Sequence, residues 1–339
     1  MKKATFSFSA ASTTFYFDTP LEQLRHLVPV ENAVIITDAN VFARHKKSLK
    51  GWRVITIAAG EQFKQQATVD DIIKQLVEMG ADRRTTLIGL GGGVITDITG
   101  YVAGVYMRGL SFGFVPTSIL AMVDAAIGGK NGIDVGLYKN MVGLIRQPSF
   151  LLYDYALLKT LPKQEWVNGF AEVIKHAAIK DAALFKMLEE SKLADYQKDT
   201  ATVARLIQRN VLLKTKVVLN DEFEHGERKL LNFGHTVGHA IENLYNIPHG
   251  HAVSIGMGVA CSISEKTVGF KDTARVLQLL KRYGLPPQFD FDKAKAIEML
   301  QKDKKKIGKG IDYIVLKKIG KAEIHTLSME ALVAMINEN

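Results

Sequence analysis

Short apolar runs alternate with helical periodicity in the first half of the chain. Buried strands are predicted at residues 34–38, 52–57, 86–90 and 112–116. Apolar side chains recur at helical spacing over residues 68–79, and Gly80 suits the end of that helix. Because buried strands that alternate with helices are typical of parallel sheets, we expect a sheet with helices on both faces.

The second half of the chain is mainly helical in pattern. Helices are predicted over residues 163–179, 182–190, 202–219, 236–244, 252–268 and 273–283. A short hairpin is expected later, with strands at 313–316 and 321–324 and Gly320 in the turn. The change of pattern predicts an α/β Rossmann-like nucleotide-binding domain at 1–160 and a mainly α-helical domain at 161–339.

A glycine-rich turn follows the predicted strand at 86–90. Its sequence, GLGGGV at 89–94, lacks the last glycine of a dinucleotide-binding fingerprint, so a tight turn with close helix packing is one interpretation. The strand before it and the helix after it favour nucleotide binding, because free N–H groups at a helix N-terminus bind phosphate. Upstream, Glu61 and Lys64 share a loop and could hold a ribose hydroxyl and a phosphate, although loop charges are usually solvated.

Histidines gather in the second half of the chain. His235 and His239 lie four positions apart, so a helix would place both on one face, about 6 Å apart. His249 and His251 follow, and Glu172 lies in an apolar helical stretch where a buried carboxylate needs a partner. Imidazoles and a carboxylate are suitable zinc ligands. Spacing alone makes both His235 and His239 candidate ligands, although any single histidine can be a structural residue.

Several cationic side chains lie beside glycines or carboxylates. They are Arg108, Lys130, Lys139, Lys175, Lys214 and Arg228. Asp124 lies between apolar residues, so we expect its carboxylate to find a lysine or hydroxyl partner. Each residue alone is most simply structural, but together they indicate a site for a substrate that carries both a carboxylate and a phosphate.

Composition and charge limit the classes of binding partner that the chain can have. The chain has 339 residues and a formal net charge of +9, enough length for about two domains and a charge that favours anionic partners. The basic cluster at 302–306 contains no aromatic residue, so it indicates a solvated face or capture of an anionic substrate, not nucleic-acid binding. One cysteine, Cys261, and no apolar run of about 18 residues predict a cytoplasmic protein without a membrane partner.

These motifs resemble the 3-dehydroquinate synthase family of sugar-phosphate cyclases, over about residues 38–320. The most specific segments are 115–141, which contains VPTS, GGKNG and KNM, and 221–235, which contains DEFEHGER and LNFGH. The resemblance implies a dehydroquinate synthase-like fold and the conversion of 3-deoxy-D-arabino-heptulosonate 7-phosphate to 3-dehydroquinate and phosphate, a step of the shikimate pathway to aromatic amino acids. It also implies NAD, a divalent metal (zinc or cobalt) and a homodimer.

The resemblance assigns a role to each candidate residue. The implied metal ligands are Glu172, His235 and His249, with His239 on the substrate side. The implied NAD-site residues are Asp38, Asn40, Glu61, Gln62, Phe63, Lys64, Gly92, Gly93, Val94, Asp97, Thr117, Ser118, Lys130, Lys139, Leu157, Leu158, Lys159 and Thr160. The implied substrate residues are Asp124, Lys130, Asn140, Lys175, Lys214, Glu224, Arg228, Asn232, His239 and Lys305, with Arg108 reaching the partner's phosphate site.

The implied mechanism uses NAD catalytically. A ring hydroxyl is oxidised to a ketone, phosphate leaves by elimination, the hydride returns, and the ring opens and closes by an intramolecular aldol step, with His239 as a proton shuttle. Two positions depart from the family pattern. Ser118 stands where a second threonine is common and keeps the hydroxyl, and His251 stands where a glutamate is common, so it is a possible competing metal ligand.

Three other functions remain open at this point. Another sugar-phosphate cyclase with an uncharged-headed substrate would leave Lys130 and Arg228 unpaired. A metal-dependent polyol dehydrogenase would share the glycine turn and the histidines, but it would release NADH. A basic binding protein that uses the lysines at 302–306 would leave the histidines and Asp124 unexplained.

Overall fold

The computed structural model describes residues 2–136, 138–304 and 310–338, with side chains omitted at 302–304. Packing divides the chain into two compact units: Met1–Glu165 with Asp199–Glu222, and Trp166–Lys198 with Phe223–Asn339. The sequence grouped Asp199–Glu222 with the later helices, whereas its helix packs on the turn at Ala121–Ala125 in the first unit. The domain boundary near residue 160 stays a prediction.

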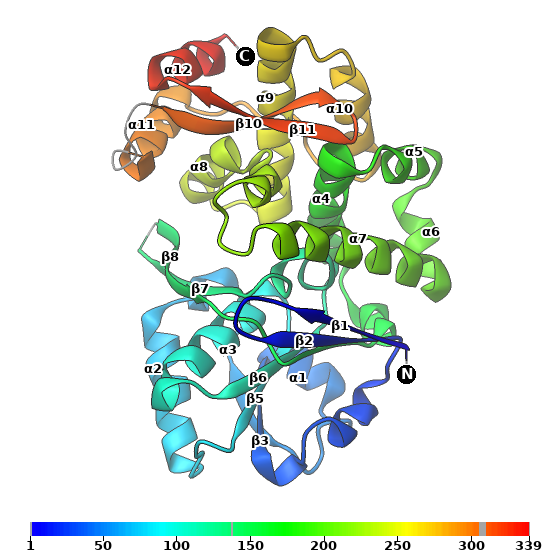
Figure 1. The fold of residues 1–339 in the computed structure, drawn as a ribbon, viewed down its shortest axis with the longest axis vertical. Helices are drawn as coiled ribbons and strands as arrows, with labels where there is room; N and C mark the ends of the chain where they lie inside the picture. Colours follow the sequence, from blue (N-terminus) through cyan, green and yellow to red (C-terminus); the bar gives the residue numbers. More distant parts are fainter. Residues whose placement is uncertain (1, 137, 305–309, 339) are drawn as a thin grey trace. The chain divides into compact units, whose positions relative to one another are not determined.

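A seven-stranded sheet forms the centre of the first unit (Figure 1). In chain order its strands are β1 (Lys2–Ser7), β2 (Ser12–Phe17), β3 (Ala33–Asp38), β4 (Arg53–Ile57), β5 (Thr86–Gly91), β6 (Ser111–Pro116) and β9 (Phe150–Tyr153). The order across the sheet is β1-β2-β9-β6-β5-β3-β4. Neighbouring strands are parallel except β1 and β2, so the predicted parallel sheet is confirmed.

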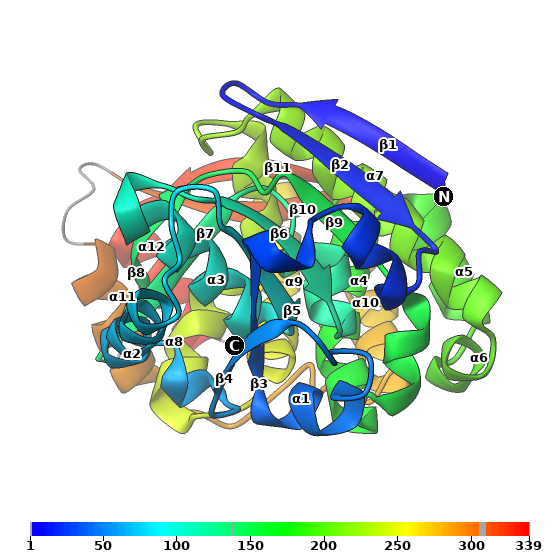
Figure 2. The ribbon, with the colours of Figure 1, turned by 90° about the horizontal axis from the view of Figure 1, so that it is seen from below.

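Helices of the first unit pack on this sheet because successive strand residues point to opposite faces. On one face, Ile35, Ile88 and Leu152 join a buried cluster with Leu24 and Leu157. The helices are α1 (Ala39–His45), α2 (Gln66–Glu78), α3 (Gly93–Val105) and α7 (Thr200–Asn220), with short turns at Leu21–His26, Val30–Asn32, Glu61–Phe63, Tyr106–Arg108, Ala121–Ala125 and Tyr155–Thr160. Figures 1 and 2 both place α7 beside β1 and β2.

A separate hairpin packs on α3. Its strands, β7 (Lys130–Val135) and β8 (Tyr138–Ile145), are antiparallel. Gly100 on α3 allows the close approach, because a Cβ atom there would lie 1.9 Å from Asn131 Oδ1 on β7. Asn131 is pinned in turn, since its Nδ2 donates to the carbonyl oxygens of Gly129 and Arg146. The hairpin is therefore held firmly against the helix that follows the glycine turn.

The second unit is mainly helical, as predicted. It contains most of α4 (Lys163–Lys180), together with α5 (Ala182–Glu190), α6 (Leu193–Lys198), α8 (His235–Tyr245), α9 (His249–Val268), α10 (Thr273–Arg282), α11 (Lys293–Lys304), α12 (Met329–Asn337) and a turn at Glu227–Asn232. The predicted hairpin is confirmed as β10 (Ile311–Lys318) and β11 (Lys321–Leu327), with Gly320 at φ +79° between them. None of the described helices has the length and apolar character needed to cross a membrane.

Candidate functional site

The glycine turn lies at the carboxyl end of β5. Gly91 must be glycine there, because a Cβ atom would lie 2.6 Å from Ile95 Cβ. Gly92 precedes the first residue of α3, so the helix N-terminus opens at this turn. Thr117 follows the neighbouring strand β6, and its N–H donates to the Gly91 carbonyl oxygen at 2.9 Å. A helix N-terminus at the carboxyl ends of parallel strands is an arrangement that can bind an anion.

Lys64 is the buried cation of this region. Its Nζ lies 2.5 Å from Asp97 Oδ2 on α3, and it donates to Asn140 Oδ1 on β8 at 2.6 Å. Burial lowers the pKa of Lys64, but the nearby carboxylates, led by Asp97, raise it well above its usual value. Lys64 therefore stays charged, and it ties the loop at 60–65 to α3 and to the hairpin.

Asp134 joins the same network, and sequence reasoning missed it. Its Oδ1 accepts from the Asn140 N–H at 2.7 Å, and its Oδ2 lies 3.3 Å from Lys139 Nζ. Its own N–H donates to the Lys64 carbonyl oxygen at 2.8 Å, while Lys139 also reaches Glu61 Oε1 at 3.0 Å. The only signal in the sequence is a carboxylate between the candidates Lys130 and Lys139. The contacts of Asp134 with Asn140, Lys139 and Lys64 depend on how the β7–β8 hairpin folds, which the sequence pattern does not show.

The other cofactor candidates lie at several carboxyl ends of the sheet. Asp38 ends β3 and caps α1, because its Oδ1 accepts from the N–H groups of Asn40 and Val41. Ser118 Oγ accepts from the Ala121 N–H at 3.2 Å. The remainder are Gln62 and Phe63 in the turn at Glu61–Phe63, Val94 in the first turn of α3, and Leu157, Leu158, Lys159 and Thr160 in the turn after β9.

The partner expected for Asp124 is Lys214. Lys214 Nζ on α7 lies 2.7 Å from Asp124 Oδ1 and donates to the Asp124 carbonyl oxygen at 2.8 Å. Arg108 is exposed and has φ +66°, between Met107 at +49° and Gly109 at +122°. Lys130, at the start of β7, is also exposed.

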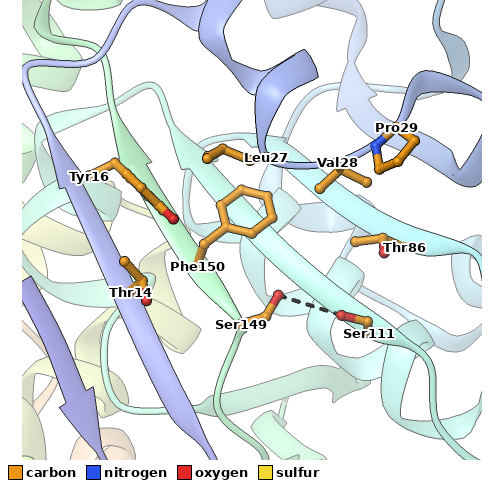
Figure 3. Close-up of a pocket in the computed structure, with 9 residues that line it drawn as sticks. All are labelled: Thr14, Tyr16, Leu27, Val28, Pro29, Thr86, Ser111, Ser149 and Phe150. Carbon is orange, nitrogen blue, oxygen red and sulfur yellow. Dashed lines mark hydrogen bonds between the residues drawn. The ribbon is translucent and has the colours of Figure 1, made fainter. Parts of the chain in front are cut away.

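A shallow pocket lies near the amino ends of β5, β6 and β9, opposite the glycine turn at the carboxyl end of β5 (Figure 3). It has a volume of about 270 Å³ and is lined by hydroxyl and apolar side chains, including Thr86, Ser111 and Phe150 near the amino ends of β5, β6 and β9. Ser111 and Ser149 are in weak hydrogen-bond contact at 3.5 Å. None of the candidate cofactor or substrate residues within the described ranges lines it.

Three helices of the second unit bring Glu172, His235 and His249 together. One ligand atom from each lies within 4.8 Å of the others. Glu172 is fully buried on α4, and its Oε1 lies 3.5 Å from His235 Nε2 and 3.4 Å from His249 Nε2. Gly250 lets α9 start close to α4, because a Cβ atom there would lie 2.2 Å from the Asn168 carbonyl oxygen.

Both rings are oriented through Nδ1. His235 Nδ1 lies 3.2 Å from the Phe233 carbonyl oxygen, and His249 Nδ1 lies 3.1 Å from Glu242 Oε2. Each ring can therefore carry its hydrogen on Nδ1 and present the Nε2 lone pair to Glu172. Two imidazole nitrogens and a carboxylate oxygen that converge in this way fit a divalent metal such as zinc.

Charge at this group also favours a cation. Burial, followed by the neighbouring Lys175 ammonium, lowers the pKa of His235 well below its usual value, so that ring is neutral. Burial lowers the pKa of His249 too, but hydrogen bonds to Glu172 and Glu242 outweigh it and raise that pKa to about 10. Lys175 Nζ pairs with Glu172 Oε2. A bound metal would take up the positive charge that the carboxylates around His249 favour.

His239 lies beside this group. The ring centroids of His239 and His235 are 5.1 Å apart, so the expected placement on one helix face is confirmed. Among the described residues, however, no ligating group contains both histidines: His239 groups with Glu242 and His249. His251, half-buried on α9, belongs to no such group within the described ranges. Spacing within one helix could not reveal that a second helix supplies the other ring.

Glu242 was not among the sequence candidates. It lies three positions after His239 and seven after His235 on α8, so helical periodicity places it on the same face. That spacing is the signal that could have identified it. The remaining substrate candidates of this unit include Glu224, whose Oε1 accepts from Asn232 Nδ2 at 2.6 Å, and Arg228, which is buried. Lys305 lies outside the described residues.

Two family models match consecutive parts of the chain. The model for the N-terminal part of 3-dehydroquinate synthase matches residues 54–168, and the model for its C-terminal part matches residues 169–306. A 3-dehydroquinate synthase of Pyrococcus abyssi is 42% identical over 286 residues, which is 84% of each chain. Another, from Thermoanaerobacter pseudethanolicus, is 36% identical over 337 residues, which is 94% of each chain.

Several solved structures share the fold. A 2-deoxy-scyllo-inosose synthase complexed with carbaglucose-6-phosphate, NAD⁺ and Co²⁺ has a TM-score of 0.86 at 23% identity, with all of both chains covered. A 2-epi-5-epi-valiolone synthase of Streptomyces hygroscopicus with NAD⁺ and Zn²⁺ has a TM-score of 0.88 at 24% identity, over 100% of this chain and 99% of that one. A probable glycerol dehydrogenase of Sinorhizobium meliloti is less similar, with a TM-score of 0.69 at 16% identity over 98% and 97%.

Proposed function

The chain belongs to the 3-dehydroquinate synthase family, and on that premise we propose how its residues convert 3-deoxy-D-arabino-heptulosonate 7-phosphate to 3-dehydroquinate and phosphate. The observation that carries the proposal is the convergence of Glu172, His235 and His249. These are the residues that the family resemblance assigns to the metal, although they come from three separate helices.

NAD and a divalent metal are the cofactors that we assign to this chain. When bound, NAD supplies reversible hydride transfer and the metal supplies Lewis acidity, so the net reaction is not a redox reaction. Glu172, His235 and His249 would hold the metal. The N-terminus of α3 would bind the NAD pyrophosphate, and the network of Lys64, Asp97, Lys139 and Glu61 would fix the loops beside it.

The cationic side chains bind and orient the two anionic groups of the substrate. Lys214, held by Asp124, and the buried Arg228 are fixed cations that need little reorganisation when an anion binds. Lys130, with Arg228, binds the carboxylate, and Lys175 adds positive charge that stabilises the phosphate as it leaves. His239, half-buried beside the metal group, moves a proton to and from the ring oxygen during opening and aldol closure.

We propose further that the enzyme is a cytoplasmic homodimer of the shikimate pathway. Arg108 supports the dimer, because its side chain is exposed and its backbone lies in a run of residues with positive φ. Strained backbone of this kind is typical of functional positions. Its guanidinium would reach the phosphate site of the partner.

Phosphate release from competing substrates tests the assignment. With NAD and zinc present, the enzyme should release phosphate from 3-deoxy-D-arabino-heptulosonate 7-phosphate and at most slowly from glucose 6-phosphate, which lacks a carboxylate. Arg228→Ala should narrow that preference, because the carboxylate loses a partner. Faster release from glucose 6-phosphate would indicate another cyclase activity. Accumulation of NADH with glycerol would indicate a polyol dehydrogenase.

A further inference from the structure

Glu242 forms a buried contact between α8 and α9. Its carboxylate Oε2 lies 3.1 Å from His249 Nδ1, and the residue is 8% exposed. An ionised carboxylate can only accept a hydrogen bond, so the contact requires a hydrogen on Nδ1. In the neutral ring that binds a metal, the lone pair is then on Nε2, and Nε2 is the atom that faces Glu172 Oε1 at 3.4 Å.

The two candidate metal-binding rings differ in how they are held. His235 Nδ1 has a main-chain acceptor, the Phe233 carbonyl oxygen, which lies two residues before it and is fixed by the start of α8. His249 stands at the start of α9, and its acceptor is a side chain from another helix. The orientation of His249 therefore depends on one substitutable residue, whereas that of His235 depends on backbone geometry.

We propose that Glu242 is a positioning residue for the metal centre: it fixes the tautomer and ring orientation of His249 and makes Nε2 a stronger donor to the metal. The inference rests on the proposed function, because it assumes that Glu172, His235 and His249 hold the metal. Outer carboxylates of this kind change metal affinity by about 10–100-fold when they are removed.

A competing arrangement is also visible at Glu242. His239, Glu242 and His249 offer ligand atoms that lie within 4.8 Å of one another. A metal bound directly by Glu242 and the same ring edge would replace the hydrogen bond between Oε2 and Nδ1. The geometry favours the positioning role, because His249 then uses each ring nitrogen once, with Nδ1 toward Glu242 and Nε2 toward Glu172.

Metal affinity of the full-length protein measures the effect without using activity. Zinc dissociation constants would be obtained by chelator competition for the wild type, Glu242→Ala, Glu242→Gln and a control, Glu227→Gln. Glu227 pairs with Lys180 and belongs to no ligating group among the described residues. We expect Glu242→Ala to bind zinc about 10–100-fold more weakly, Glu242→Gln to lie between it and the wild type because glutamine keeps an acceptor oxygen, and Glu227→Gln to match the wild type.

A cobalt spectrum and one further variant separate the possible failures. Visible absorption of Co²⁺-loaded Glu242→Gln should keep the band pattern of the wild type. At saturating metal, kcat of Glu242→Gln should be closer to the wild-type value than its zinc affinity is. Equal zinc affinity in both Glu242 variants and the wild type would overturn the inference, as would a changed coordination spectrum, which would make Glu242 a ligand. His235→Ala tests the metal centre itself: unchanged zinc affinity in that variant would contradict the proposed function instead.

Discussion

The network around Lys64 and the group around Glu172 stabilise buried charge in different ways. Both contain buried charge, but the first is made of loops and a hairpin linked through main-chain bonds, such as Asp134 N–H to the Lys64 carbonyl oxygen. The second consists of side chains from three helices, with two ring nitrogens turned toward one fully buried carboxylate.

The difference lies in where preorganisation comes from. Each cation of the first network already has carboxylate partners, and the bound phosphate would meet backbone N–H groups, so single side chains should matter modestly there. In the second group the carboxylates favour additional positive charge at His249. A bound metal should therefore contribute strongly to the stability of the second unit, and loss of one ligand should be costly.

Metal removal should have the largest effect. At a metal concentration about 1,000 times the dissociation constant, binding should stabilise the folded protein by about 4 kcal/mol. Hydrogen exchange with and without chelator measures this segment by segment. Protection should fall in α4, α8 and α9 and stay unchanged in α3 and the β7–β8 hairpin. Equal loss of protection in both units would remove the distinction between them.

Glu172→Gln should come next. Loss of the buried carboxylate weakens metal binding and should lower kcat by about 10²–10³-fold, the usual effect of removing a group that stabilises transition-state charge. NAD affinity, measured by calorimetry, should stay at the wild-type value because the NAD candidates lie in the other unit. A fully active variant would show that Glu172 is not a ligand.

Two glycine substitutions should each weaken ligand binding in one unit only. Gly250→Ala would force a Cβ atom against the Asn168 carbonyl oxygen, and Gly100→Ala would force one against the pinned Asn131 side chain. Each should lower the free energy of unfolding by about 1–3 kcal/mol. Gly250→Ala should weaken zinc binding and Gly100→Ala should weaken NAD binding. The reverse pairing in titrations would contradict the account.

Asp134→Ala should have the smallest effect. It removes an ion pair to Lys139 and the acceptor for the Asn140 N–H, but leaves the Lys64–Asp97 pair in place. We expect NAD affinity to fall about fivefold, or about 1 kcal/mol, with zinc affinity unchanged. Asp134→Asn should recover part of the loss, because it keeps an acceptor oxygen. A loss of more than about 100-fold would mean that Asp134 contacts the cofactor.

The sequence predicted those parts of the fold whose signals are local and strong. The apolar runs of β3–β6 and the periodicity of the long helices were sufficient, and Gly320 marked the last hairpin. The β1–β2 hairpin was missed because the buried side of β2 carries Thr13 as well as Phe15 and Phe17, and the aromatic Tyr16 lies on the other side, so apolar and polar residues do not alternate clearly. β9 has only four residues, and the β7–β8 hairpin is rich in glycine and polar residues.

The candidate site divides along the same line. The spacing of His235 and His239 predicted a shared helix face, and the apolar setting of Asp124 predicted a partner, which is Lys214. Which histidine faces Glu172 depends on how α8 and α9 cross, and the contacts of Asp134 and Glu242 join segments that are distant or on separate helices. Tertiary packing of this kind leaves little trace in local spacing.

We propose that both cofactor sites serve one non-redox elimination and cyclisation. The most direct measurement is phosphate release from 3-deoxy-D-arabino-heptulosonate 7-phosphate by chelator-treated protein, with NAD and zinc restored singly and together, while NADH absorbance is followed. We expect phosphate release only when both NAD and zinc are restored, with no net NADH. Release without either cofactor, or NADH that accumulates in proportion to phosphate, would contradict it.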